Sequence, residues 1–154
     1  EVREKLLQSG VIEGQKDFWD CLRIEAGIPV YGVDLDRTTL LPELGEKAID
    51  YDKGCYIGQE VVAKIKYIGH VNRQFLGLKV GGLRLPTPKS PVWIAGKEIG
   101  YVTSSARSVS LNSGIALAFL RDAGTKPGTE VDVLVDGETQ RAVVSELPFA
   151  SVNH

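Results

Sequence analysis

Turn residues divide the second half of the chain into six short stretches typical of β-strands, and this division restricts the fold more than any other feature. Breaks fall at Gly81-Gly82, Asn112-Ser113-Gly114 and Lys126-Pro127-Gly128. Asp136-Gly137 lies between two strand-like runs and predicts a tight hairpin. Six short antiparallel strands at this spacing predict a small closed barrel. The expected strands are Arg73–Val80, Val92–Ala95, Glu98–Ser105, Gly114–Leu120, Thr129–Val135 and Thr139–Glu146.

The first seventy residues are expected to be helical and irregular. Apolar spacing predicts one helix over Glu1–Gln8 and another over Gln15–Ala26. Gly27 ends the second helix, and Ile28-Pro29 gives it an extended exit. The predicted apolar face of this helix carries the residues at three- and four-residue steps, namely Phe18, Cys21, Leu22 and Glu25.

A long irregular segment follows from Val30 to Gly45, and long ordered loops in compact domains are usually functional. Short helices are expected near Glu43–Ile49 and after Gly58. The fold class is therefore α+β, with a helical and loop segment before a six-stranded antiparallel β-barrel. We expect one domain over residues 1–70 and a barrel domain over residues 71–150.

Composition bounds the setting of the protein. None of the 154 residues is methionine, and the chain opens within a predicted helix, so we expect an N-terminal portion of the natural protein to lie outside it. Two cysteines are too few for a disulfide framework and suggest a reducing compartment, with the cytoplasm as the default. No apolar run is long enough to cross a bilayer, so no membrane association is expected.

One stretch has a strong charge bias. Between Val61 and Lys97 the chain has basic residues but no Asp or Glu. This stretch is either a solvated side of the barrel or a docking surface for a carboxylate-rich small molecule or a phosphate backbone. Direct nucleic-acid binding is not expected, because aromatic residues for base stacking are sparse there: Tyr67, Phe75 and Trp93.

The segment Lys53-Gly54-Cys55-Tyr56-Ile57-Gly58-Gln59-Glu60 carries the sharpest chemical signal. Cys55 precedes a predicted helix start, and the Lys53 ammonium is two residues away. Both features stabilise a thiolate, the reactive form of cysteine. The glycines allow close approach to a ligand. The alternative is that Cys55 is a small buried apolar residue, because no histidine or second cysteine lies near it in sequence.

This segment resembles the signature of the YgfZ-type folate-binding proteins, within the YgfZ/T-protein family. The resemblance extends to Leu22-Arg23-Ile24-Glu25-Ala26-Gly27-Ile28-Pro29, to Tyr31-Gly32 and Asp34, and to Gly69-His70-Val71-Asn72-Arg73. Leu147-Pro148-Phe149 is similar to the usual close of the barrel. The likeness covers about residues 18–149 and implies that the chain is the C-terminal portion of such a protein.

The resemblance implies a tetrahydrofolate site. Arg23 would contact folate, or it would form a structural ion pair with Glu25 or an acid of the following loop. Trp19 would stack on the pterin, or it would pack against the core. Cys55 and Lys53 would supply the thiol chemistry, with no metal ligand. The remaining candidates for the folate site are Glu25, Tyr31, Gly54, Tyr56, Gly58, Gln59 and Glu60.

Three functions follow from these features. The first is a folate-binding accessory protein, not an enzyme, for the assembly or repair of iron–sulfur client enzymes, including tRNA-modifying ones. The second is an aminomethyltransferase of the glycine-cleavage T-protein type. The T-protein draws a catalytic aspartate from a portion that precedes the segment resembled here, which favours the first function. The third is a nucleic-acid-binding barrel, supported only by the basic stretch.

Overall fold

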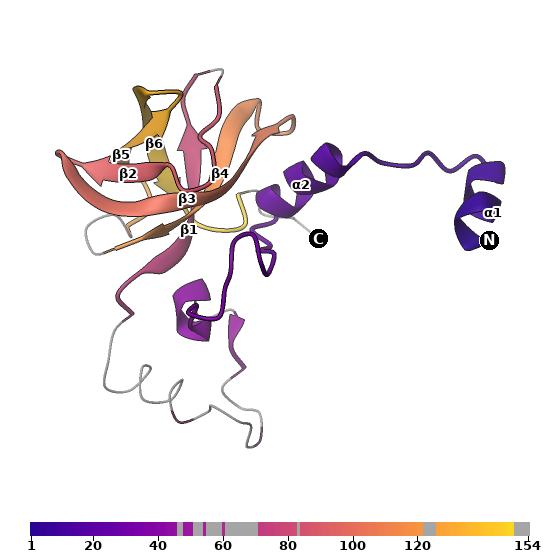
Figure 1. Cartoon of the computed structure of the whole chain (residues 1–154), viewed down its shortest axis with the longest axis horizontal. Helices are drawn as coiled ribbons and strands as arrows, with labels where there is room; N and C mark the ends of the chain where they lie inside the picture. Colours follow the sequence, from indigo (N-terminus) through magenta and orange to yellow (C-terminus); the bar gives the residue numbers. More distant parts are fainter. Residues whose placement is uncertain are drawn as a thin grey trace.

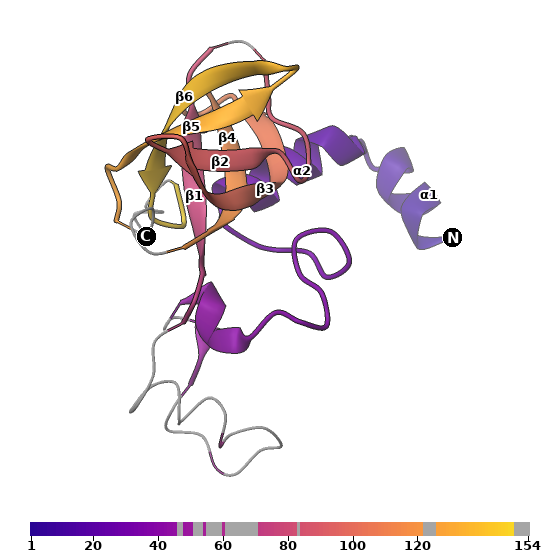
Figure 2. The same cartoon turned by 60° about the vertical axis from the view of Figure 1, so that its left-hand side comes forward.

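The computed structural model describes residues 1–45, 48–50, 54, 60, 71–82, 84–121 and 126–149. Its helices are α1 (Val2–Gln8), α2 (Lys16–Glu25) and the short 3-10 helix η1 (Leu41–Leu44). Six antiparallel strands close into a barrel in the order β1-β4-β3-β2-β5-β6, which confirms the predicted α+β class (Figure 1, Figure 2). The strands are β1 (Gln74–Val80), β2 (Pro91–Ile94), β3 (Lys97–Ser108), β4 (Ser113–Leu120), β5 (Glu130–Val135) and β6 (Glu138–Ser145).

The β5–β6 hairpin forms where the sequence predicts it. Val135 pairs with Glu138, so Asp136 and Gly137 are the two turn residues. Both have positive φ, at 50° and 83°. A two-residue turn of this kind matches the twist of the strands, and Asp-Gly adopts it at little steric cost.

Two apolar clusters lie on opposite sides of the barrel wall. The inner cluster fills the barrel and includes Leu78, Val102 and Val133. The outer cluster lies where α2 and residues 147–149 cover β1, β3 and β4, and it includes Ile24, Phe75 and Phe119. Strand β4 contributes to both clusters, and its residues from Gly114 to Leu120 are all buried. This is why that segment reads as a continuous apolar run instead of an alternation.

The end of α2 is tied to the C-terminal segment. Gly27 has φ +68°, and the Ile28 N–H donates to the Arg23 carbonyl at 2.8 Å, which forms a Schellman-type cap. A side chain at Gly27 would meet Leu147 Cβ at 2.7 Å. The Phe149 N–H donates to the Glu25 carbonyl at 3.0 Å, so the segment after β6 is held against the end of α2.

The buried face of α2 differs from the predicted one. Arg23 and Ile24 are the buried residues of the helix, while Phe18 is 60% exposed and Leu22 is 42% exposed. Spacing alone cannot place the face, because the outer cluster takes Ile24 and a buried acid on the next loop draws in Arg23. The exposed apolar side chains of α2 therefore lie on the side away from the barrel.

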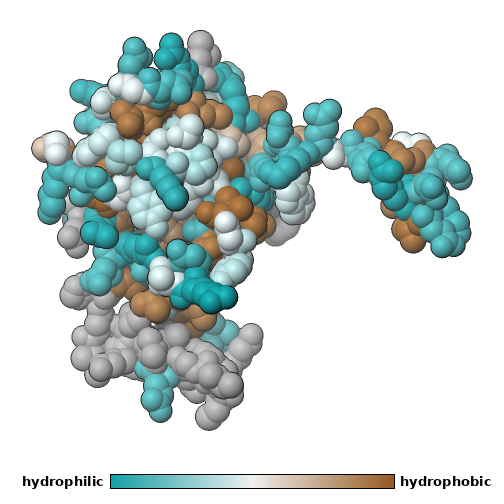
Figure 3. All heavy atoms as spheres, in the orientation of Figure 1, coloured by the Kyte–Doolittle hydropathy of each residue, from teal (hydrophilic) through white to brown (hydrophobic). Residues whose placement is uncertain are grey.

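Other elements differ from expectation in smaller ways. Helix α1 extends away from the barrel and buries no residue, and its apolar side chains are visible in the space-filling view (Figure 1, Figure 3). Of the helix expected near Glu43–Ile49, the structure describes the 3-10 helix η1, which ends at Leu44 where Gly45 follows with φ +90°, while residues 46 and 47 lie outside the described residues. The helix expected after Gly58 lies outside the described residues. The division into domains at residue 70 stays a prediction.

Candidate functional site

A buried ion pair joins α2 to the long loop that follows it. Arg23 Nη1 lies 2.9 Å from Asp34 Oδ2, and the two side chains are 5% and 0% exposed. Arg23 Nε also donates to Asp20 at 2.6 Å, and its Nη2 donates to Ser104 Oγ at 3.0 Å. Burying charges costs several kcal/mol unless they are paired and hydrogen-bonded, and this pair meets both conditions.

Asp34 is the centre of this network. Its Oδ2 also accepts the Val30 N–H at 2.9 Å, which closes the start of the loop on itself. Its Oδ1 accepts the hydroxyl groups of Thr103 and Ser104, both at 2.5 Å. These two residues are consecutive on β3, where a register shift between Val102 and Ser104 marks a bulge. The bulge lets neighbouring side chains turn toward the same acid, which a regular strand forbids.

A second buried acid fixes the far end of the loop. Glu43 on η1 accepts two bonds from Arg73, at 2.9 and 3.2 Å. Arg73 Nη1 donates to the Tyr101 hydroxyl at 3.0 Å, and its guanidinium lies 4.4 Å from the centre of the Phe119 ring. The pKa of Arg73 is raised, mainly by its hydrogen bond to Glu43. The loop is thus held on the barrel at Asp34 and at Glu43.

Glu25 links the end of α2 to the end of β3. Its carboxylate accepts the Ser108 hydroxyl at 2.5 Å, and this bond is the main cause that lowers the pKa of Glu25. Cys21, one turn earlier, donates to the Arg107 carbonyl at 3.2 Å. Burial, and then the nearby Glu25 carboxylate, raise the pKa of Cys21. This thiol is therefore poorly suited to act as a nucleophile at neutral pH.

Hollows follow the loop along the barrel. A groove of about 650 Å³ runs between α2 and β3, and its lining includes Trp19, Arg23, Val33 and Thr103. A neighbouring hollow of about 540 Å³ shares Val33 and Thr103 and adds Tyr101. A third, mainly polar hollow of about 530 Å³ lies beside Arg73. The three hollows lie along the segment that Asp34 and Glu43 hold in place.

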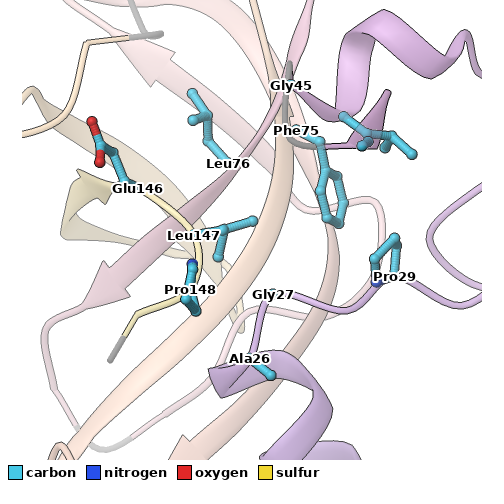
Figure 4. Close-up of a pocket in the computed structure, with 11 residues that line it drawn as sticks. Ala26, Gly27, Pro29, Gly45, Phe75, Leu76, Glu146, Leu147 and Pro148 are labelled. Atoms are coloured by element: carbon cyan, nitrogen blue, oxygen red, sulfur yellow. The ribbon is translucent and has the colours of Figure 1, made fainter. Parts of the chain in front are cut away.

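A separate apolar cavity of about 560 Å³ lies near the end of α2 (Figure 4). Phe75, Leu147 and Pro29 reach it from three different segments, and Glu146 is the one charged residue among the described residues that line it. Such a lining offers few polar groups to orient a ligand.

The structure places some predicted site residues and leaves others undescribed. Arg23 has the ion-pair partner expected from the following loop. Trp19 is 63% exposed and lines the groove between α2 and β3. Tyr31 is 67% exposed, while Glu25 is hydrogen-bonded to β3. Gly54 and Glu60 are described only as isolated positions. Outside the described residues lie Lys53, Cys55, Tyr56, Gly58 and Gln59.

Sequence reasoning missed the residues that complete the network: Glu43, Thr103 and Ser104. A pair of hydroxyl residues within a strand is a weak signal, and only the bulge explains why both face Asp34. Within the described part of the chain, no group of three or more His, Cys, Asp or Glu residues is arranged to hold a metal ion. None of the helices there is long and apolar enough to cross a membrane.

Comparison with known proteins gives the family. Residues 73–150, just over half of the chain, match the glycine cleavage T-protein C-terminal barrel domain. The chain therefore belongs to the glycine cleavage T-protein family, and its barrel is the C-terminal barrel of that family.

Individual relatives extend the likeness beyond the barrel. The chain is 37% identical over 143 residues to an aminomethyltransferase of Moorella thermoacetica, which covers 92% of this chain and 39% of the relative. It is 37% identical over 131 residues to an aminomethyltransferase of Aquifex aeolicus, covering 84% of this chain and 36% of that one. The crystal structure of glycine cleavage system aminomethyltransferase T from Bartonella henselae matches with a TM-score of 0.74 at 27% identity, over 85% of this chain and 37% of that one.

These relatives correct two expectations. They are named aminomethyltransferases, which are enzymes, so the expected accessory role for iron–sulfur enzymes is wrong and so is the expectation of no enzymatic activity. The comparisons also give no support to a link with tRNA modification. The similarity extends over most of the chain, whereas the segment around Cys55 is only eight residues long. The chain spans about 39% of the length of the Moorella relative.

Proposed function

We propose that this chain forms the C-terminal part of a folate-dependent aminomethyltransferase. The observation that carries the proposal is the likeness to aminomethyltransferases over 92% of this chain, which includes α2 and the loop as well as the barrel. The reaction class is transfer of a one-carbon unit from an aminomethyl-lipoyl donor to tetrahydrofolate. This activity is proposed for the complete enzyme, of which this chain forms the C-terminal part.

The groove between α2 and β3 fits a pterin in two respects. Trp19 offers an exposed indole face for stacking on a flat heterocycle. Arg23 forms the wall of the groove, and four hydrogen bonds to Asp20, Ile28, Asp34 and Ser104 hold it rigid. A guanidinium has five N–H groups, so one remains to donate to a pterin oxygen or nitrogen. Because four of its five N–H groups are bonded within the protein, Arg23 acts mainly as a positioning residue.

Tryptophan fluorescence tests the folate site, because the chain has two tryptophans. Of these two, Trp93→Phe keeps Trp19 and Trp19→Phe keeps Trp93, while the rest of the gene product is the same in both variants. Titration of the full-length gene product with tetrahydrofolate should give a larger saturable change in the first variant than in the second. An assay with an aminomethyl-lipoyl substrate should then give methylene-tetrahydrofolate. Folded protein that neither responds to tetrahydrofolate nor turns over would refute the proposal.

Several narrower expectations stay predictions. The assignment to the YgfZ type depends on Lys53–Glu60, most of which lies outside the described residues. An activated Cys55 is tested by the pH dependence of its reaction with iodoacetamide, where an ordinary or raised pKa would contradict it. The cytoplasmic location and the lack of nucleic-acid binding also stay predictions. Nucleic-acid binding would be recognised by a steep loss of affinity with salt.

A further inference from the structure

The segment after β6, residues 146–149 and here called the strap, completes the hydrogen bonding of α2. The carbonyl groups in the last turn of a helix have no partners within the helix and must find them elsewhere. In α2 the Arg23 carbonyl accepts the Ile28 N–H at 2.8 Å, from the chain that directly follows the helix. The Glu25 carbonyl instead accepts the Phe149 N–H at 3.0 Å. The strap therefore supplies part of the C-terminal cap of α2.

Two glycines form the surface on which the strap lies. A Cβ on Gly27 would lie 2.7 Å from Leu147 Cβ. A Cβ on Gly77 would lie 2.5 Å from the Phe149 ring and 3.1 Å from Leu147 Cδ2. Leu147 thus packs against the end of α2 and against β1 at once, and Figure 4 shows it beside Gly27. The strap joins the helix end to the barrel through these contacts.

The Phe149 ring also fixes how the last turn of α2 faces the barrel. Phe149 and Ile24 are both buried members of the outer cluster, 8% and 1% exposed. Successive residues of an α-helix point about 100° apart around its axis. Because Ile24 is held against the barrel, the direction in which the next residue, Arg23, leaves the helix is fixed as well.

The position of Arg23 leaves little room for displacement of the helix end. Its guanidinium donates to Asp34 on the loop at 2.9 Å and to Ser104 on β3 at 3.0 Å, and such bonds weaken steeply when their geometry changes. Trp19 lies one turn before Arg23 on the same side of α2, and both residues line the groove. A shift of the helix end would therefore move both groups together relative to β3.

We infer that Phe149 and Leu147 are positioning residues for the groove between α2 and β3, an inference that rests on the proposed function. Neither residue is among the described residues that line the groove. They act through the last turn of α2, which they hold against β1. Arg23 and Trp19 thereby keep the spacing across the groove that tetrahydrofolate binding requires.

Phe149→Leu in the full-length gene product tests this inference, because leucine keeps the segment apolar but loses the ring that contacts Gly77. Calorimetry should show tetrahydrofolate binding weakened about tenfold, the size expected when one hydrogen bond to a charged group is lost. The KM for tetrahydrofolate should rise by a similar factor, while kcat and the KM for the aminomethyl-lipoyl substrate stay unchanged. A loss of folded protein alone would lower kcat and leave both KM values unchanged.

Two further variants separate positioning from stability. Val133→Ala removes a fully buried side chain from the inner cluster on β5, so it should lower the Tm without changing the affinity for tetrahydrofolate. Arg23→Lys should weaken binding by itself. Adding Phe149→Leu to Arg23→Lys should then weaken binding little further, because the two residues act through one contact.

The outcomes distinguish failure of the strap inference from failure of the proposed function. Unchanged tetrahydrofolate affinity in Phe149→Leu overturns the inference and leaves the proposed function standing. An equal weakening by Val133→Ala, or additive effects of Arg23→Lys and Phe149→Leu, overturns it in the same way. A folded wild-type protein that neither binds tetrahydrofolate nor turns over removes the proposed function and the inference with it.

Discussion

Arg23 Nη1 and Asp34 Oδ2 lie 2.9 Å apart as a buried pair, so one salt bridge holds the end of α2 to the loop that follows it. The same acid binds two hydroxyl groups of β3. The loop, the helix and the barrel therefore share a single buried charge centre. Removing that centre should affect all three elements together.

Asp34→Asn should destabilise the protein by about 3 kcal/mol, because it leaves the Arg23 charge buried with its main partner neutralised. Urea unfolding followed by circular dichroism measures the loss. Glu130→Gln, which removes a surface ion pair with Arg141, is the control and should change little. Equal effects in the two variants would contradict the assigned role of Asp34.

Arg73→Lys should destabilise the protein by about 1–3 kcal/mol, although it keeps the charge. Lysine cannot reproduce the two bonds to Glu43 or the stacking on Phe119. Hydrogen exchange should also speed up at the Leu40 and Glu43 amides, since Glu43 would hold the loop less firmly. Arg121→Lys is the matched comparison, because Arg121 lines the same polar hollow as Arg73, and its exchange rates should stay those of the wild type.

Gly77→Ala should destabilise the barrel by about 1–3 kcal/mol through overpacking. A Cβ at this position would lie 2.5 Å from the Phe149 ring. Thermal unfolding gives the size of the effect, and Phe149→Ala should relieve part of it in the double variant. Gly14→Ala, where the nearest side-chain atom would be 3.6 Å away, should leave stability unchanged. Additive effects at positions 77 and 149 would argue against this contact.

The stability contribution of Glu25 should depend on pH with a definite sign. Its folded-state pKa is lowered, chiefly by the Ser108 hydroxyl, so the contribution is present above the ordinary glutamate pKa and is lost as the pH falls through the lowered value. The difference in unfolding free energy between wild type and Glu25→Gln should be constant near neutral pH and should shrink below about pH 4.3. A difference that stays constant down to pH 2 would contradict the lowered pKa.

Cys21 should react slowly with iodoacetamide. Burial raises the pKa of its thiol, and the Glu25 carboxylate adds to the shift. In a Cys55→Ser background, the pH midpoint of alkylation should lie above about 8.5, the ordinary value for cysteine. Glu25→Gln should lower this midpoint by removing a negative charge. The same protein unfolded in urea provides the reference thiol, and equal midpoints in the two states would refute the shift.

The sequence by itself determined the barrel and the positions of its turns. Strand alternation and turn chemistry are local properties, so Asp136-Gly137 predicted its hairpin, and Gly27 predicted the end of α2. For Arg23 the sequence predicted two alternatives, a ligand contact or an ion pair with an acid of the next loop. Local patterns could not place the buried face of α2, because both candidate faces carry apolar residues.

Only the tertiary structure decided which polar groups meet. Thr103 and Ser104 reach Asp34 because of a bulge in β3, and Glu43 reaches Arg73 across 30 residues of chain. Strand register pairs Gln74 with Leu120, and the next residues along, Arg73 and Arg121, line the same hollow. These contacts depend on how the loop lies on the barrel, which is fixed by burial of charges that must find partners once water is excluded. Such long-range pairing leaves no periodic trace in the sequence.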